Sequence, residues 1–195
     1  MKLLDSKTYF NLAKSYAGEC QARVRYEFME YCARNEGLKQ LAILIDKVVY
    51  NEFNHARMFY TKIQDASDNP IKNIDICTGY PFKEKWDLLD ALEFAVEDEQ
   101  TEVEIYKSFA KTAKEEGFMD IALLFENVSQ VENCHAMRFK EIHKQLKNGS
   151  MYRKPKAVKW KCGDCGYEAT GKEAWKICPL CQAKQGSVML IFDEE

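Results

Sequence analysis

Apolar residues recur at steps of three and four along four long stretches of the chain, the spacing that places side chains on one face of an α-helix. The pattern predicts four helices, each roughly 45 Å long by helical rise, over residues 6–35, 38–65, 85–114 and 118–147. Gly37 and Gly117 mark tight turns after the first and third helices. Nearly twenty residues separate the second helix from the third, which suits a crossover along a four-helix bundle.

The two halves of this helical region repeat one another at an offset of 80 residues. The residues of the first half that recur without a gap are Gly37, Ala42, Leu44, Val48, Glu52, His55, Ala56 and Phe59, which match Gly117, Ala122, Leu124, Val128, Glu132, His135, Ala136 and Phe139. Upstream, at the same offset, Glu19 matches Glu99 and Tyr26 matches Tyr106. We expect such a chain to build one metal site from two halves.

The repeated glutamates fall at one level of the predicted bundle. Glu19 lies 18 residues before its turn glycine and Glu52 lies 15 residues after it, so an antiparallel hairpin brings them together. The second half does the same for Glu99 and Glu132. Four buried carboxylates would repel one another and would be costly to bury unpaired. Bound cations resolve this conflict.

Each Glu-x-x-His motif adds an imidazole to the same helix face as its carboxylate, because residues three apart are neighbours on a helix. A glutamate from each of two helices with Glu-x-x-His from the other two is the arrangement of ferritin-like carboxylate bundles. Oxygen-rich ligation with two imidazoles suits iron or manganese better than zinc. The candidate metal ligands of the bundle are therefore Glu19, Glu52, His55, Glu99, Glu132 and His135.

One position breaks the symmetry of the repeat. Glu102 faces the same way as Glu99, but its repeat partner is Ala22, so the two metal positions should not be equivalent. The neighbouring acidic residues fall off the apolar stripe and are expected to be solvated: Glu93, Glu97, Asp98 and Glu104. Tyr26 and Tyr106 are either core aromatics or hydrogen-bond donors to the ligand carboxylates.

Charge and hydropathy exclude several partners. The net charge of −3 gives no reason to expect nucleic acid or an anionic membrane surface as partner. No apolar stretch is long enough to span a bilayer, and charged residues interrupt the first residues, which do not form a signal peptide. We therefore expect a cytoplasmic location.

The C-terminal part of the chain carries a second kind of metal site. Cys162, Cys165, Cys178 and Cys181 form two Cys-x-x-Cys pairs, a strong signal for tetrahedral thiolate ligation of iron or zinc. The site is either a one-iron electron-transfer centre or a zinc staple for a small fold. A linker is predicted from Asn148-Gly-Ser150, with composition changing at Lys159. The predicted domains are residues 1–148 and 149–195.

Both regions together resemble the rubrerythrin family. The resemblance rests on Ala17-Gly-Glu-Cys-Gln-Ala-Arg23, the two Glu-x-x-His motifs, Ala95-Val-Glu-Asp-Glu99, Lys159-Trp-Lys-Cys-Gly-Asp-Cys-Gly-Tyr167 and Cys178-Pro-Leu-Cys181. It implies a mainly α fold: a ferritin-like four-helix bundle with a long crossover, followed by a small rubredoxin-like β-ribbon domain. It also implies two irons in the bundle and one iron, or zinc, among the cysteines.

The resemblance implies a role for each ligand. Glu52 and Glu132 would bridge the irons, and His135 with Glu99 would bind one of them. Glu19 would bind the other, together with Glu102 when oxidised and His55 when reduced. Counted back from Tyr106, the third helix is one residue short of the family pattern, which would place Asp98 and Thr101 at the ligand positions instead. The internal repeat favours Glu99, and a local helix bulge could reconcile the two counts.

The activity implied is reduction of hydrogen peroxide to water, which protects a low-oxygen cytoplasm. The catalytic carboxylates would be Glu19, Glu52, Glu99, Glu102 and Glu132. Electrons would arrive through the four-cysteine iron from NADH, by way of a separate reductase or a rubredoxin. Because a mid-bundle site lies far from a C-terminal domain, we expect a head-to-tail homodimer or a higher oligomer. The alternative is a ferroxidase or iron-storage protein with a structural zinc ribbon.

Overall fold

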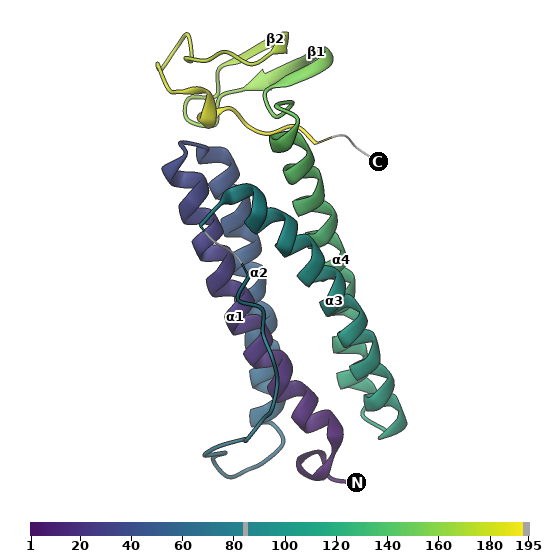
Figure 1. The fold of residues 1–195 in the computed structure, drawn as a ribbon. Coiled ribbons are helices and arrows are strands. Elements are labelled where there is room, and N and C mark those ends of the chain that lie inside the picture. The colour runs from purple at the N-terminus through teal and green to yellow at the C-terminus, as the bar shows by residue number, and fades with distance from the viewer. Residues whose placement is uncertain (84–85, 193–195) are drawn as a thin grey trace.

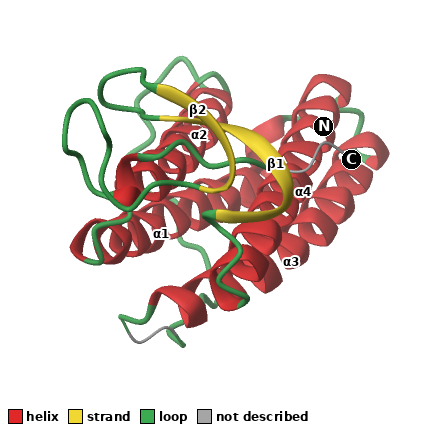
Figure 2. Ribbon diagram, turned by 90° about the horizontal axis from the view of Figure 1, so that it is seen from above, coloured by secondary structure: helices red, strands yellow, loops and turns green. Residues whose placement is uncertain are grey.

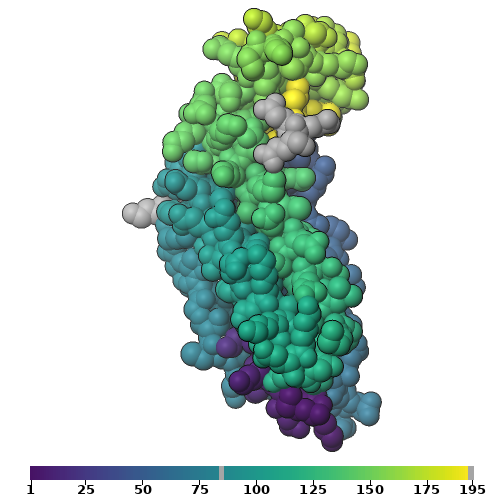
Figure 3. All heavy atoms as spheres, turned by 90° about the vertical axis from the view of Figure 1, so that its right-hand side faces the viewer, coloured from purple at the N-terminus to yellow at the C-terminus, as the bar shows by residue number. Residues whose placement is uncertain are grey.

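The computed structural model describes residues 1–83 and 86–192, which form an elongated helical bundle with a small sheet across one end (Figures 1 and 3). The helices are α1 (Lys7–Asn35), α2 (Lys39–Gln64), α3 (Leu88–Glu115) and α4 (Met119–Lys147). The strands are β1 (Arg153–Lys161) and β2 (Glu168–Glu173). The predicted fold class is confirmed, with helix ends within three residues of the expected ones.

Local sequence explains where the helices begin and end. The side chains of Ser6 and Asp87 accept hydrogen bonds from the first turns of α1 and α3, which fixes both N-termini. The predicted start of the third helix at residue 85 lies outside the described residues. Gly37 and Gly117 have φ of 75° and 88°, a conformation that favours glycine at a helix C-terminus. The repeat therefore includes both turns.

The crossover between α2 and α3 returns along the outside of α1 (Figure 1). Its described residues, 65–83, 86 and 87, contain no helix or strand. Ile71, Ile74 and Ile76 pack against the apolar cluster at the lower end of the bundle, and Tyr80 donates a hydrogen bond to the Lys14 carbonyl. The crossover thus covers part of the seam between the two hairpins.

The bundle core consists of two apolar clusters. One contains Leu41, Ile45 and Phe139, and the other contains Phe59 and Phe125. Full burial of each such side chain stabilises the fold by about 1.5–3 kcal/mol. These clusters hold the four helices together on either side of the buried glutamates.

The sheet belongs to a second, smaller core. β1 and β2 pair antiparallel, and Trp160 packs with Ala174 and Val188. Met151 still belongs to the bundle core, and Tyr152 contacts both cores. The chain therefore passes from α4 to the sheet through a short turn. β1 begins at Arg153, before the change in composition at Lys159, so most of the segment predicted as a linker after Ser150 is strand. The domain bounds of 1–148 and 149–195 stay a prediction.

The sheet lies over one end of the helices (Figure 2), and the segment around Gly186 docks closely on the α1–α2 turn. A Cβ atom on Gly186 would lie 1.8 Å from the Gly37 carbonyl oxygen, far inside van der Waals contact. Beside this contact, Lys39 Nζ lies 2.5 Å from Asp164 Oδ1, and Ser187 donates to the second oxygen of Asp164. The four-cysteine region is thus held against one end of its own bundle.

No helix in the described ranges is both long and apolar enough to cross a membrane.

The close backbone approach at Gly186 makes a testable prediction. Gly186→Ala should lower the free energy of unfolding by about 1–3 kcal/mol, the usual cost of overpacking. Gly79→Ala is the matched control, because a Cβ at Gly79 meets nothing within 4 Å. Denaturant unfolding of both variants measures the difference. Equal stability of the two variants would contradict the docking described.

Candidate metal centre

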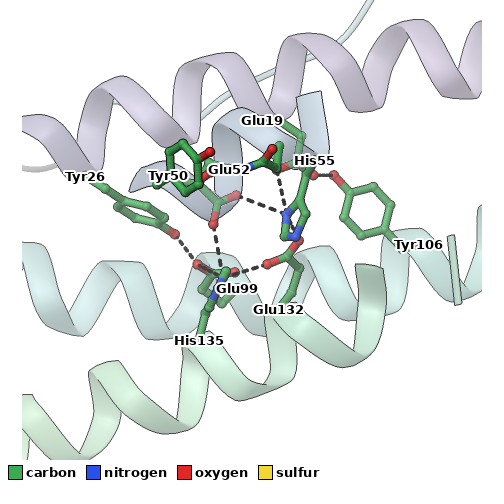
Figure 4. A network of polar contacts seen from close by, with 10 residues as sticks. Glu19, Tyr26, Tyr50, Glu52, His55, Glu99, Tyr106, Glu132 and His135 are labelled. Carbon is green, nitrogen blue, oxygen red and sulfur yellow. Dashed lines mark hydrogen bonds and ion pairs between the residues drawn. The ribbon is translucent and has the colours of Figure 1, made fainter. Parts of the chain in front are cut away.

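Two groups of buried candidate ligands meet at mid-height of the bundle (Figure 4). All four helices contribute to them. The first group is Glu19, Glu52, His55 and Glu132, and the second is Glu52, Glu99, Glu132 and His135. Within each group the ligand atoms lie within 4.8 Å of one another. Glu52 and Glu132 belong to both groups, which is the position that two bridging carboxylates require.

The imidazoles point into these groups through the same nitrogen. His55 Nδ1 lies 2.9 Å from Glu132 and 3.4 Å from Glu19. His135 Nδ1 lies 2.8 Å from Glu132 and 3.0 Å from Glu52. The two rings are 6.0 Å apart and inclined by 27°. The near-symmetry of these contacts follows from the sequence repeat.

The site contains more buried polar atoms than its hydrogen bonds satisfy. Glu19, Glu52, Glu99 and Glu132 are fully buried. Both carboxylate oxygens of Glu52 and Glu132 and the Nδ1 atoms of both histidines lack a hydrogen bond among the described residues. Buried polar groups are normally paired, so oxygen and nitrogen donors aimed at a common centre fit cations. This donor set suits two iron ions.

Two tyrosines tie the hairpins together across the site. The Tyr26 hydroxyl on α1 donates to Glu99 on α3 over 2.7 Å, and the Tyr106 hydroxyl on α3 donates to Glu19 on α1. Both rings are buried. The two expectations for these residues are therefore both met: they are core aromatics and they orient ligand carboxylates, as such partners commonly do in metal sites.

Burial and charge shift the pKa values of these groups in opposite directions. Burial raises the pKa of Glu19, and it raises the pKa of Glu99 to about 8. Burial also disfavours ionised Glu52, but contacts with His135 and His55 lower its pKa. For His135, burial favours the neutral ring, and contacts with Glu132, Glu52 and Glu99 nevertheless raise its pKa to about 12.

Glu102 lies beside the site and outside both ligand groups. Its Oε2 atom is buried and without a hydrogen bond. Burial, followed by the charge of Glu99, raises its pKa well above the ordinary value. Its role as an exchangeable ligand stays a prediction, as do the individual ligand roles of the other residues.

Asp98 is not at the site. It lies on the next face of α3, where Asp98 Oδ2 pairs with Arg25 at 2.5 Å and Oδ1 lies 3.2 Å from Lys83. Its side chain is only 15 % exposed, so the expectation that it is solvated is wrong.

The other alternative position, Thr101, does not point to the site either, because its hydroxyl donates a hydrogen bond to the Glu97 carbonyl. α3 is an uninterrupted α-helix in the described residues, so the helix bulge that would reconcile the two residue counts is absent there.

The other acidic residues near the site are exposed as expected: Glu93, Glu97 and Glu104.

The four cysteines form the second metal centre. Their sulfur atoms lie within 4.8 Å of one another, and Cys162 and Cys178 are buried while Cys165 and Cys181 lie at the surface. The residue after each pair, Gly166 or Gln182, has positive φ and donates its N–H to the carbonyl of the first cysteine. Two equivalent knuckles thus face one tetrahedral position.

Comparison with known proteins decides the family. The rubrerythrin family model matches residues 11–88 and 90–162, and the model of its rubredoxin-like domain matches residues 160–187. The chain belongs to the rubrerythrin family. Rubrerythrin from Clostridium perfringens is 39% identical over 92% of this chain and 91% of its own length. Rubrerythrin from Porphyromonas gingivalis is 33% identical over 92% and 88%.

Solved structures agree on the fold. Partially reduced nigerythrin superposes with a TM-score of 0.62 at 22% identity, covering 98% of this chain and 94% of its own. Bacterioferritin from Desulfovibrio desulfuricans gives 0.60 at 25% identity but covers only 73% of this chain and 81% of its own. The predicted ferritin-like bundle and rubredoxin-like domain are confirmed.

Family membership and geometry together define the cofactors. As a rubrerythrin, the chain has a di-iron carboxylate–histidine site in the bundle and a four-cysteine metal site in the rubredoxin-like domain. It is an iron-containing oxidoreductase of the peroxidase type.

Sequence patterns did not reveal the Arg25–Asp98 pair or the position of Tyr80. Asp98 was visible only as an acidic residue off the apolar stripe, and its partner lies 73 residues away on another helix. Tyr80 lies in a loop, which has no periodicity. Arg25, directly before Tyr26, was the available signal, because a cation on a half-buried helix face requires a partner.

The pKa directions predict that metal binding releases protons. In apoprotein at neutral pH, Glu19, Glu99 and both imidazoles should carry protons that metal ions displace. Loading the bundle site and the four-cysteine site with Co²⁺ should therefore release about three to four protons more than the cysteines alone release, and the affinity of the bundle site for Co²⁺ should rise between about pH 6 and pH 8. A pH indicator in weak buffer measures the release.

The control for this titration is the double variant Glu52→Ala/Glu132→Ala, which keeps the four cysteines and so reports their proton release alone. If the intact apoprotein releases no more protons than this variant, the assigned protonation states are wrong.

Proposed function

We propose that this protein reduces hydrogen peroxide to water at the di-iron site. Electrons would reach that site one at a time through iron in the four-cysteine centre, supplied by NADH through a separate reductase or a rubredoxin. The role would be protection of a low-oxygen cytoplasm. The observation that carries the proposal is the pair of ligand groups sharing Glu52 and Glu132, in one chain with a four-thiolate site.

The electron balance fits this arrangement. Hydrogen peroxide takes up two electrons and two protons, its O–O bond breaks, and two water molecules form. Two ferrous ions, when bound, supply both electrons at one place. Glu52 and Glu132 would hold the two ions, while Tyr26 and Tyr106 keep Glu99 and Glu19 in position.

Glu102 is the residue best placed to move during the reaction. Its half-buried carboxylate has an unpartnered oxygen and lies next to the ligand groups. We assign it as the exchangeable carboxylate. Because its raised pKa favours a protonated form, it is also suited to hold a proton for the departing oxygen.

Iron storage is less well supported. The bacterioferritin relative aligns with 70% of this chain and has 26% identity. A storage subunit also has no need of a four-thiolate site docked at the bundle end, whereas an enzyme that receives single electrons does.

The first experiment is metal content combined with one turnover. Purified protein should contain about three irons per chain and be red from iron–thiolate absorption. Each hydrogen peroxide molecule should reoxidise one reduced di-iron site and yield two water molecules. A colourless protein with zinc among the cysteines, or a reduced site that peroxide does not oxidise, would contradict the proposal.

Substitution of Glu102 separates redox function from metal binding. Glu102→Ala should leave iron bound, because alanine already occupies the equivalent position 22 in the first half. Peroxide turnover should fall about 10- to 100-fold. Glu104→Ala is the control, since Glu104 lies on the same helix with its side chain 72% exposed. Loss of the whole di-iron site in Glu102→Ala would make Glu102 a structural ligand instead.

The electron path suggests a head-to-tail dimer or a higher oligomer. The rubredoxin-like domain docks at Lys39, about 20 Å of helical rise from Glu52. In a head-to-tail pair, each four-cysteine site would lie beside the partner's di-iron site.

Mixing two inactive variants tests this arrangement. Cys178→Ser removes electron delivery and Glu52→Ala removes the di-iron site, so a random mixture of refolded chains should recover about a quarter of wild-type NADH-linked turnover. Each variant alone is the control. Full turnover by a protein that sediments strictly as a monomer would refute electron transfer between chains.

A further inference from the structure

A pocket of about 360 Å³ lies in the seam between α1 and α3, beneath crossover residues 78–81. Glu102 and Tyr106 form part of its wall, and Tyr80 covers it from the crossover. In Figure 1 the crossover runs along this side of α1. The pocket therefore connects the outside of the bundle with residues that border the di-iron site.

The inner end of the pocket is chemically distinct from its rim. Glu102 presents a buried oxygen without a hydrogen bond, and Tyr106 donates to the candidate ligand Glu19. The ligands themselves are fully buried or nearly so. A small molecule in the pocket would thus meet Glu102 before any atom of the ligand groups.

The internal repeat breaks at this pocket. The candidate ligands and the two tyrosines are the same in both halves, yet the residues that line the pocket, apart from Tyr106, differ from their repeat partners. At the 80-residue offset, Gly18 corresponds to Asp98, Ala22 corresponds to Glu102, and Arg25 corresponds to Ile105. Metal binding accounts for the symmetric positions, and it leaves the asymmetric ones unexplained. A route into the site from one side accounts for them.

Gly18 and Tyr80 lie close to one another in the wall of the pocket. Glycine inside a helix costs about 1 kcal/mol relative to alanine, and Gly18 has no positive φ that would require it. A Cβ there would lie 3.9 Å from Tyr80 Cε1, so a larger side chain would fill the space. Tyr80 is held to α1 by a hydrogen bond of 3.3 Å to the Lys14 carbonyl.

We infer that this pocket is the route by which a small, uncharged oxidant reaches the di-iron site, and that Tyr80 restricts the route to molecules near the size of hydrogen peroxide. The inference rests on the proposed function and specifies its substrate class. The wall carries both signs of charge, in Lys14 and in the Arg25–Asp98 pair, so it favours neither anions nor cations and fits an uncharged visitor.

The test uses iron-loaded, chemically reduced protein and two rates. The first is the rate of absorbance change on mixing with nitric oxide, an uncharged diatomic probe of access that requires no turnover. The second is the ratio of oxidation rates with cumene hydroperoxide and hydrogen peroxide. Tyr80→Ala should raise this ratio about tenfold by widening the route. Ile105→Trp, at a pocket residue 40% exposed, should slow nitric oxide binding about tenfold.

Tyr31→Ala is the matched control, because Tyr31 is 57% exposed and does not line the pocket. Iron content and thermal unfolding are measured for each variant, and Gly18→Leu provides a second narrowing if Ile105→Trp loses iron. The inference would be overturned if Tyr80→Ala had the same hydroperoxide ratio as the control and the narrowed variant bound nitric oxide as fast as the control.

The two proposals can fail separately. If wild-type protein does not reduce peroxide but nitric oxide binding still slows in the narrowed variant, the proposed function fails and the access route stands. If peroxide turnover is normal and neither variant changes either rate, the route fails alone.

Discussion

Burial of four carboxylates at one level of the bundle is the constraint on which the rest of this structure depends. Such groups cannot stay ionised and unpaired in a core. Two imidazoles supply ligand atoms from the same level, and two tyrosines hold the outer carboxylates. The apolar clusters on either side hold the helices in place. The polar level therefore works as a preformed site for two cations.

The residues that repeat between the two halves of the bundle and the residues that do not repeat have different roles in this account. The repeated glutamates, histidines and tyrosines build two similar halves of the site. The positions that differ lie mostly on the side of the bundle that the crossover covers. Glu102 there corresponds to Ala22 in the repeat, and Arg25 corresponds to Ile105. Docking of Gly186 on the α1–α2 turn fixes the four-cysteine centre at the end of the same bundle.

The four helices and the candidate metal ligands could be predicted from the sequence, because the helical period gives the buried face of each helix and the repeat gives the matching positions in the two halves. Glu19 and Glu52 were placed at one level by counting from Gly37, and the structure brings them into one group. Contacts between separate elements could not be predicted, because neither the helical period nor the repeat relates the residues that make them. Asp98 is predicted in solvent but pairs with Arg25, and most of the segment predicted as a linker after Ser150 belongs to strand β1. Both depend on how separate elements pack.

The most direct test of the central claim is a crystal structure of iron-loaded protein with anomalous scattering at the iron edge. For the chemically reduced protein, the account predicts two iron positions in the bundle, both bound by Glu52 and Glu132, with His55 and His135 on opposite ions. A single iron position, or two positions that share neither glutamate, would contradict it.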